Sequence, residues 1–161
     1  KEFNAIPYGT EALGVMRIEK GHVTGNELNG QISAQNLGME KFLSKTKDYI
    51  GKTLSERSGL NADNKLILMG FKPLDKRKKL TAGSHLIKKN KDFILENDEG
   101  WLSSVAYSPT LGYSIGLGFI ENGKNRIGET VQAVNLLQKT YIDVKIVSPH
   151  FYDPNGEKLR D

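Results

Sequence analysis

Apolar residues recur at helical spacing near the start of the chain. Between Tyr8 and Gly21 they lie three or four positions apart, which predicts a helix that ends where a glycine can adopt the left-handed C-cap conformation. Gly9 and Gly14 each weaken this helix by about 1 kcal/mol relative to alanine. Ala12, Val15, Met16 and the polar Glu19 fall at helical spacing, and Leu13 and Ile18 widen the apolar stripe.

The next forty residues show weaker patterns. Residues 38–45 alternate imperfectly between apolar and polar positions, which favours a strand. Residues 48–56 predict a short helix with Asp48 as its N-cap. The stretch 57–65 is rich in glycine, asparagine and serine and marks a candidate domain boundary.

From Leu66 onward the pattern changes to short runs rich in β-branched and aromatic residues. Turn signals such as Asn122-Gly123 separate the runs, and no helical periodicity of useful length interrupts them. This pattern predicts a small antiparallel barrel or sandwich. The predicted strands are 66–71, 84–88, 93–96, 101–108, 114–120, 129–134 and 140–147.

The predicted strand 101–108 carries a specific expectation about side-chain direction. Side chains on a regular strand alternate between its two faces. Trp101, Ser103, Val105 and Tyr107 are therefore expected to share one face. The mixture of large and small residues on that face would suit a tapered barrel interior.

Composition narrows the class of protein without identifying it. The 161 residues are 37% hydrophobic and 26% charged, as in a soluble globular chain. The absence of cysteine excludes disulfides and thiol nucleophiles and fits a reducing compartment. No apolar run reaches the roughly 20 residues of a membrane span, and no signal-peptide pattern opens the chain. We therefore expect a cytoplasmic protein that does not bind membranes.

The positive charge of the chain is unevenly distributed. The formal net charge is +4, with clusters at residues 76–79 and 88–91. Such clusters favour lysines that keep a sheet edge soluble, because no aromatic residues are interleaved to stack bases. No nucleic-acid partner is expected, and polyanion binding through Lys76, Arg77, Lys78 and Lys79 is kept as a further hypothesis.

Local motifs point to no catalytic or metal centre. Gly51-Lys52-Thr53 lacks the earlier glycine of a phosphate-binding loop. The histidines at positions 22, 85 and 150 lie more than sixty residues apart without acidic partners at ligand spacing, so no metal site is expected. Ser103 and Ser104 do not occupy the turn of a serine nucleophile.

Six segments together resemble a known family. The chain is similar to the end of the catalytic part of the glycine cleavage T-protein (aminomethyltransferase) family, and within it to the C-terminal region of the alpha subunit of sarcosine oxidase. The resemblance follows the same order over nearly the whole chain. The segments are YGTEALGVMRIEKG, TGNELNGQISAQNLGM, KDYIGKTLSERSG, SSVAYSPTLGYSIGLGFI, IGETV and VKIVSPHFYDPNGEK.

This resemblance implies an α+β fold in two parts. Residues 1–57 would form the C-terminal part of a folate-binding catalytic domain, and residues 58–161 a small antiparallel β-barrel domain. A helix so close to the first residue, with no initiator methionine before it, suggests a fragment that lacks the N-terminal part of this domain. The expected partners are that missing part of the same chain and the other sarcosine oxidase subunits.

The resemblance also implies a function for the full-length protein. It would take part in oxidative demethylation of sarcosine with one-carbon transfer to tetrahydrofolate, while flavin and NAD bind outside these residues. The alternatives are an aminomethyltransferase, or a non-catalytic module that supports the structure or docks subunits. The family's catalytic aspartate and pteridine-binding glutamate lie upstream, so no catalytic residue is expected here. The fragment alone is expected to be inactive.

Three residues are expected at the rim of the folate cavity, namely Arg17, Glu19 and Lys41. Arg17 and Glu19 point about 200° apart on a helix and should find separate partners. We expect Glu19 to be held by backbone amides or a cation of residues 25–31. Two positions depart from the T-protein pattern: Leu13 replaces an arginine, and Lys41 replaces an aromatic residue. We therefore expect residues 1–161 alone to bind tetrahydrofolate no tighter than about 10 μM.

Overall fold

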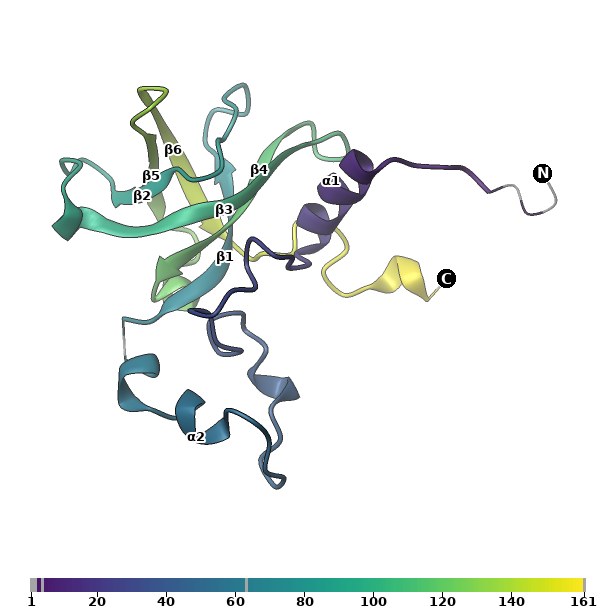
Figure 1. Ribbon diagram of the computed structural model, residues 1–161. Coiled ribbons are helices and arrows are strands. Elements are labelled where there is room, and N and C mark those ends of the chain that lie inside the picture. The colour runs from purple at the N-terminus through teal and green to yellow at the C-terminus, as the bar shows by residue number, and fades with distance from the viewer. Residues whose placement is uncertain (1–2, 4, 63, 161) are drawn as a thin grey trace.

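The computed structural model describes residues 3, 5–62 and 64–160, which include all residues of the barrel core. Six antiparallel strands form a barrel in the order β1-β4-β3-β2-β5-β6, and pairing of β6 with β1 closes it (Figure 1). Of the two architectures that the sequence predicts, a barrel or a sandwich, the structure shows the barrel. The strands are β1 (Leu66–Pro73), β2 (His85–Lys88), β3 (Asp98–Ser108), β4 (Tyr113–Glu121), β5 (Thr130–Asn135) and β6 (Thr140–Val147).

Two apolar clusters occupy the two sides of the barrel wall. The inner cluster fills the barrel and includes Phe71, Leu86 and Leu102, all without solvent exposure. The outer cluster lies over β1, β3 and β4 and includes Leu117 and Phe119. The first helix, α1 (Thr10–Lys20), covers this outer cluster and contributes Ile18 to it. An apolar outer face in addition to the apolar interior explains why β1 and β4 have nearly continuous apolar sequences.

The helix near the start of the chain is confirmed. It ends at Gly21, whose φ of 77° is the left-handed conformation expected of a C-cap. A Cβ at Gly21 would lie 2.6 Å from the carbonyl oxygen of Pro149, so the helix end also requires glycine for close packing. Figure 1 shows the C-terminal segment running along this end of α1.

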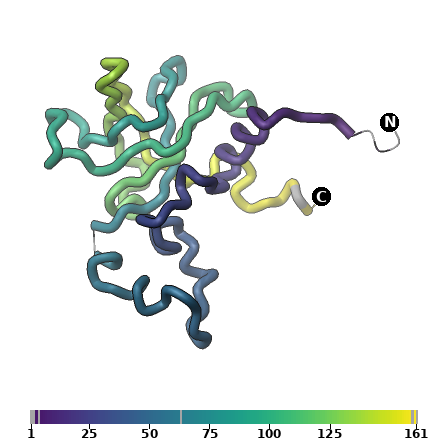
Figure 2. The backbone as a smooth tube through the Cα atoms, viewed as in Figure 1, coloured from purple at the N-terminus to yellow at the C-terminus, as the bar shows by residue number. Residues whose placement is uncertain are grey.

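The segment between α1 and β1 is mostly irregular (Figure 2). The strand predicted over 38–45 is wrong, because the 3₁₀ turn Glu40–Phe42 occupies its centre. The helix predicted over 48–56 shrinks to α2 (Lys52–Ser55). Its N-cap is Gly51 with a φ of 87°, not Asp48, because a left-handed residue cannot continue a helical turn. A further 3₁₀ turn, Ser58–Leu60, precedes β1.

Two strand predictions in the barrel are also corrected. The run 93–96 is no strand; it leads into the 3₁₀ turn Leu95–Asn97, after which β3 begins. The expected common face of Trp101 and Val105 is wrong as well. Trp101 packs against the outer cluster and Val105 against the inner cluster. A β-bulge between Leu102 and Ser104 interrupts the alternation and reverses the faces.

Two further 3₁₀ turns lie after β4 and after β6. Gly123–Arg126 follows β4, and Glu157–Leu159 lies near the C-terminus. In the part of the chain that the structure describes, no helix is long and apolar enough to cross a membrane.

Candidate functional site

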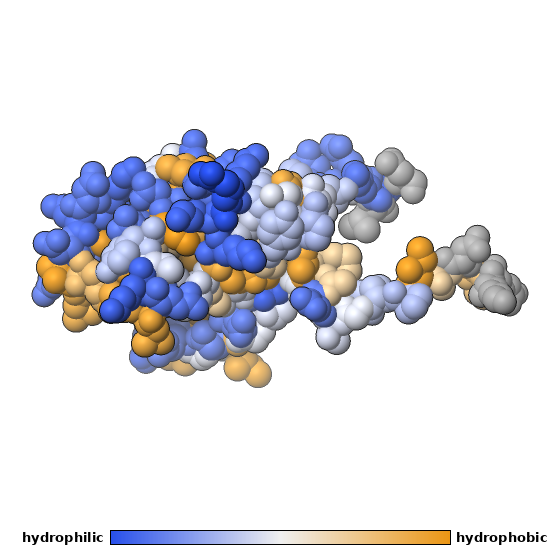
Figure 3. Space-filling model, turned by 90° about the horizontal axis from the view of Figure 1, so that it is seen from above, coloured by the Kyte–Doolittle hydropathy of each residue, from blue (hydrophilic) through white to orange (hydrophobic). Residues whose placement is uncertain are grey.

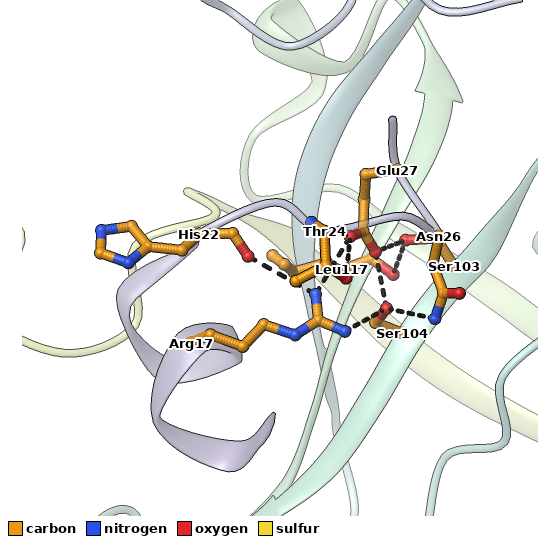
Figure 4. A network of polar contacts seen from close by, with 8 residues as sticks. All are labelled: Arg17, His22, Thr24, Asn26, Glu27, Ser103, Ser104 and Leu117. Atoms are coloured by element: carbon orange, nitrogen blue, oxygen red, sulfur yellow. Dashed lines mark hydrogen bonds and ion pairs between the residues drawn. The ribbon is translucent and has the colours of Figure 1, made fainter. Parts of the chain in front are cut away.

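The last two turns of α1 direct Arg17 toward the outer face of β3 (Figure 4). Its Nη1 donates to Oε2 of Glu27 at 3.0 Å and its Nη2 donates to Oγ of Ser104 at 2.6 Å. The side chain retains 14% of its exposure. Two separate partners hold the planar guanidinium in one orientation, which a flexible ammonium group would not achieve.

Glu27 lies at the centre of this polar network with no solvent exposure. Oε1 accepts hydrogen bonds from the hydroxyls of Ser103 and Ser104, both at 2.6 Å. Oε2 accepts from the backbone N–H of Thr24 at 2.9 Å as well as from Arg17. A buried carboxylate is tolerated when it is paired and its lone pairs are occupied, and both conditions hold here.

The environment of Glu27 favours its ionised form. Burial by itself would raise the pKa of this carboxyl, since it removes water from the charged form. The hydrogen bonds from Ser103, Ser104 and the Thr24 backbone, with the charge of Arg17, outweigh burial and hold the pKa of Glu27 below its ordinary value of 4.5. Glu27 and Arg17 therefore form an ion pair at neutral pH.

The β-bulge of β3 is what brings two consecutive serines to the same carboxylate. Leu102 pairs with Gly118 and Ser104 with Leu117, so Ser103 is the extra residue. Both hydroxyls then point to the outer face, where Glu27 lies (Figure 4). Ser104 uses its full capacity, since it donates to Glu27 and accepts from Arg17 and from Asn26 Nδ2 at 3.2 Å.

Sequence reasoning missed this network. It considered the two serines as strand residues and as nucleophiles that lack the required turn, and it did not consider Glu27. The only available signal was the pair of adjacent serines between two apolar runs, Trp101-Leu102 and Val105-Ala106-Tyr107, where a bulge can send both hydroxyls to one face.

Glu19 has separate partners from Arg17, as expected, but not the expected ones. Its carboxylate is buried, and Oε1 accepts a hydrogen bond from Ser108 Oγ at 2.5 Å. The prediction that residues 25–31 hold Glu19 is wrong, because that loop supplies Glu27 to Arg17 instead. The alternative of a solvated side chain is also wrong. Helix geometry sends residue 19 to the end of β3, away from the loop.

The backbone of Glu19 has a second role at the end of α1. Its carbonyl oxygen accepts from the N–H groups of Phe151 and Tyr152, both at 2.9 Å. His150 Nδ1 donates to the carbonyl oxygen of Lys20 at 2.9 Å. The last carbonyls of a helix lack partners within it, so the C-terminal segment supplies them. Lys20 adds an ion pair to Asp153 at 3.0 Å.

We expect Glu19→Gln to lower the free energy of unfolding by about 1 to 2 kcal/mol, because the amide oxygen accepts from the buried Ser108 hydroxyl more weakly than a carboxylate does. Ser108→Ala should produce a similar loss, and the double variant should lose less than the sum. Urea denaturation of the three variants measures this. Additive losses would show that Glu19 and Ser108 do not depend on each other.

Two open grooves flank Arg17. The first has a volume of about 810 Å³ and lies between α1 and β3; it includes Ala12, Val15, Val105 and Tyr107. The second has a volume of about 470 Å³ and lies between α1 and the C-terminal segment; it includes Leu13, Met16, Glu19 and Lys158. Arg17 lines both grooves.

The structure does not bring Lys41 to these grooves. It lies in the exposed turn Glu40–Phe42 and lines neither groove that Arg17 lines. Arg17 and Glu19 do share the second groove. Among residues 3, 5–62 and 64–160, no group of three or more histidine or acidic side chains is placed to hold a metal ion.

More than half of the chain matches a known protein family. The family description "Glycine cleavage T-protein C-terminal barrel domain" matches residues 67–153. The crystal structure of glycine cleavage system aminomethyltransferase T from Bartonella henselae shares the fold with a TM-score of 0.73. It is 17% identical in sequence, and the match covers 89% of this chain and 38% of that one.

Two groups of curated proteins are similar in sequence. Sarcosine oxidase subunit alpha of Rhizobium meliloti (strain 1021) is 43% identical over 160 residues, which is 99% of this chain and 16% of that protein. Aminomethyltransferase of Aquifex aeolicus (strain VF5) is 33% identical over 129 residues, which is 80% of this chain and 34% of that protein. The chain thus spans only about a sixth of the length of the first of these relatives.

Proposed function

Because this chain belongs to the glycine cleavage T-protein family through its C-terminal barrel domain, we propose that it serves folate-linked one-carbon transfer in a sarcosine oxidase alpha-type protein. The observation that carries this proposal is the similarity to a sarcosine oxidase alpha subunit over 99% of the chain. In the complete protein, the reaction would be oxidative demethylation of sarcosine with transfer of the one-carbon unit to tetrahydrofolate. Flavin and NAD would bind outside these residues, in a cytoplasmic assembly of several subunits.

We further propose that residues 1–57 complete a folate-binding domain and residues 58–161 form the barrel that supports it. Exposed apolar side chains support the first part of this proposal: Phe3, Ile6 and Tyr8 are 85%, 85% and 65% exposed, and Leu13 and Met16 on α1 are 50% and 44% exposed. Apolar side chains gathered on one segment mark a surface that another part of a protein covers.

The residues present fit an anionic end of folate at one position. Arg17 is rigidly held, carries a permanent charge and borders both grooves. Its role would be to bind and orient a carboxylate through charge-assisted hydrogen bonds. Glu19 would act indirectly, by fixing the groove wall through Ser108 and the C-terminal segment. Lys41 would meet the glutamate tail only as an exposed point charge. Tetrahydrofolate itself accepts the one-carbon unit when bound.

Arg17→Lys in the full-length protein tests this proposal. We expect the dissociation constant of tetrahydrofolate to rise at least about tenfold, because lysine keeps the charge but not the planar donor geometry. Lys41→Met should raise it less, and Lys47→Met, at another exposed lysine, should not change it. Calorimetric titration measures the constants, and thermal unfolding checks that each variant is folded.

An unchanged dissociation constant in folded Arg17→Lys would remove Arg17 from the folate site. Absence of tetrahydrofolate binding by the wild-type full-length protein would contradict the proposed function as a whole. The expectation that residues 1–161 alone bind no tighter than about 10 μM stays a prediction.

The first alternative is an aminomethyltransferase, supported by the similarity to the Aquifex aeolicus enzyme over 80% of the chain. The substrate distinguishes it: sarcosine-dependent reduction of a flavin should be absent, and transfer from an aminomethyl donor present. A non-catalytic module is the second alternative. It would leave tetrahydrofolate turnover unchanged when Arg17 is replaced.

A further inference from the structure

Two loops meet at one end of the barrel. One is the β1–β2 loop, of which residues 74–81 matter here, and the other is the tip of the β5–β6 hairpin, residues 136–139. Thr81 Oγ1 donates a hydrogen bond to Gln138 Oε1 at 3.0 Å, which joins them. Figure 1 shows both loops projecting from the same end, away from α2 and from the chain termini. We call residues 74–81 and 136–139 the basic end of the barrel.

The basic end holds a net charge equal to that of the whole chain. Its five cationic side chains and single carboxylate, Asp75, give +4, so the cationic and acidic residues elsewhere balance. Only Arg77 is paired there, with Asp75 at 3.0 Å, while Lys76 lies over the ring of Tyr113. The described residues offer no salt bridge to Lys78, Lys79 or Lys139, all of which are exposed.

Apolar side chains project beside these charges. Leu137, at the hairpin tip, is 97% exposed, and Leu136 and Leu74 are 48% and 51% exposed. Tyr141, just after the tip, is 57% exposed. Hairpin tips normally carry small polar residues that suit the turn. Seen from this end, the surface is mostly hydrophilic with small hydrophobic areas set among it (Figure 3).

From this juxtaposition we infer that the basic end of the barrel docks another protein subunit, through a partner surface that offers an apolar hollow for Leu137 bordered by carboxylates. The inference rests on the proposed function, which places the chain in an assembly of several subunits. An aliphatic anchor surrounded by charges that lack partners matches the usual arrangement of an interface core and rim. Opposite charge on the partner would also guide association and suppress incorrect partners.

Charge and side-chain type argue against three other occupants. A second copy of this chain would bring another +4 against the first, which opposes self-association through this end. Nucleic acid is disfavoured because the central exposed side chain of this end is a leucine. Leucine can neither stack on a base nor neutralise a phosphate. An anionic membrane would gain little from two leucines at a narrow tip, compared with an amphipathic helix.

The test uses the full-length protein co-expressed with its partner subunits. The variant Leu137→Ser, Lys78→Glu, Lys79→Glu should weaken subunit association at least about tenfold, measured by sedimentation velocity at low salt. Wild-type association should weaken as salt rises, and the variant should respond less. The matched control is Leu95→Ser, Lys45→Glu, Lys47→Glu, which makes the same changes at exposed residues elsewhere and should assemble normally.

Two kinds of result decide against the inference. If the basic-end variant binds the partner subunits as tightly as the wild-type protein does, this end is not the interface. Loss of a homodimer, of binding to a DNA duplex, or of binding to phosphatidylserine vesicles, with subunit association unchanged, would assign the surface to another occupant. Tetrahydrofolate titration of the same samples separates the two proposals. A wild-type protein that assembles through this end without binding folate would contradict the proposed function and support the docking surface.

Discussion

Glu27→Gln is expected to lower the free energy of unfolding by about 2 to 4 kcal/mol, although glutamine has almost the same shape. Glu27 is fully buried and accepts hydrogen bonds from four residues, Arg17, Thr24, Ser103 and Ser104. An amide would place an N–H group against some of these donors and would leave the nearly buried guanidinium unpaired. Breaking a buried ion pair on one side costs more than the pair itself contributes.

Urea denaturation at neutral pH measures this loss. The matched control is Glu40→Gln, which removes the exposed pair between Glu40 and Lys124 and should cost at most about 1 kcal/mol. Equal effects of the two substitutions would contradict the importance of burial at Glu27.

The same variant should change how stability depends on pH. The folded-state pKa of Glu27 lies below its ordinary value of 4.5, so the unfolded chain binds this proton first. Its contribution is therefore complete above about pH 5 and is lost as pH falls through the folded-state pKa. As pH falls below about 5, the stability of the wild-type protein should fall more steeply than that of Glu27→Gln. Parallel curves would show that Glu27 does not contribute to acid unfolding.

Gly100→Ala is expected to cost about 3 kcal/mol or more and to disturb the pairing of β3 with β4. Gly100 pairs with Ile120, and its φ is 153°. A Cβ there would lie 1.9 Å from the carbonyl oxygen of Phe119 and 2.9 Å from the Cα of Ile120. Both are backbone atoms of the neighbouring strand, so no side chain can rotate to make room.

Two alanine controls separate steric overlap from backbone strain. Gly59→Ala meets no atom within 4 Å and should change stability by at most about 0.5 kcal/mol. Gly112→Ala also meets no atom but has a φ of 77°, so it should cost about 1 kcal/mol. Thermal and urea unfolding of the three variants give the comparison. A loss at Gly100 no larger than at Gly112 would mean that the strands can move apart at little cost.

Local patterns in the sequence determined the elements that are regular. The apolar spacing of α1, its stop at Gly21 and the strand-forming runs from Leu66 onward could all be read along the chain. They are set by helix periodicity, turn chemistry and strand propensity, which depend on near neighbours. The strand predictions for 38–45 and 93–96 were wrong, because a short imperfect pattern does not distinguish a strand from an irregular segment.

Only the tertiary structure decided where the polar side chains meet. The bulge at Ser103 depends on how β3 pairs with β4, and it places two hydroxyls on Glu27, which lies 76 and 77 positions away in the sequence. The burial of Glu19 on Ser108 likewise follows from how α1 packs against the barrel. The chain by itself therefore determined the elements and the family of this protein. Its buried charge network depends on long-range register and packing, because a one-residue shift of a strand turns every side chain to the other face.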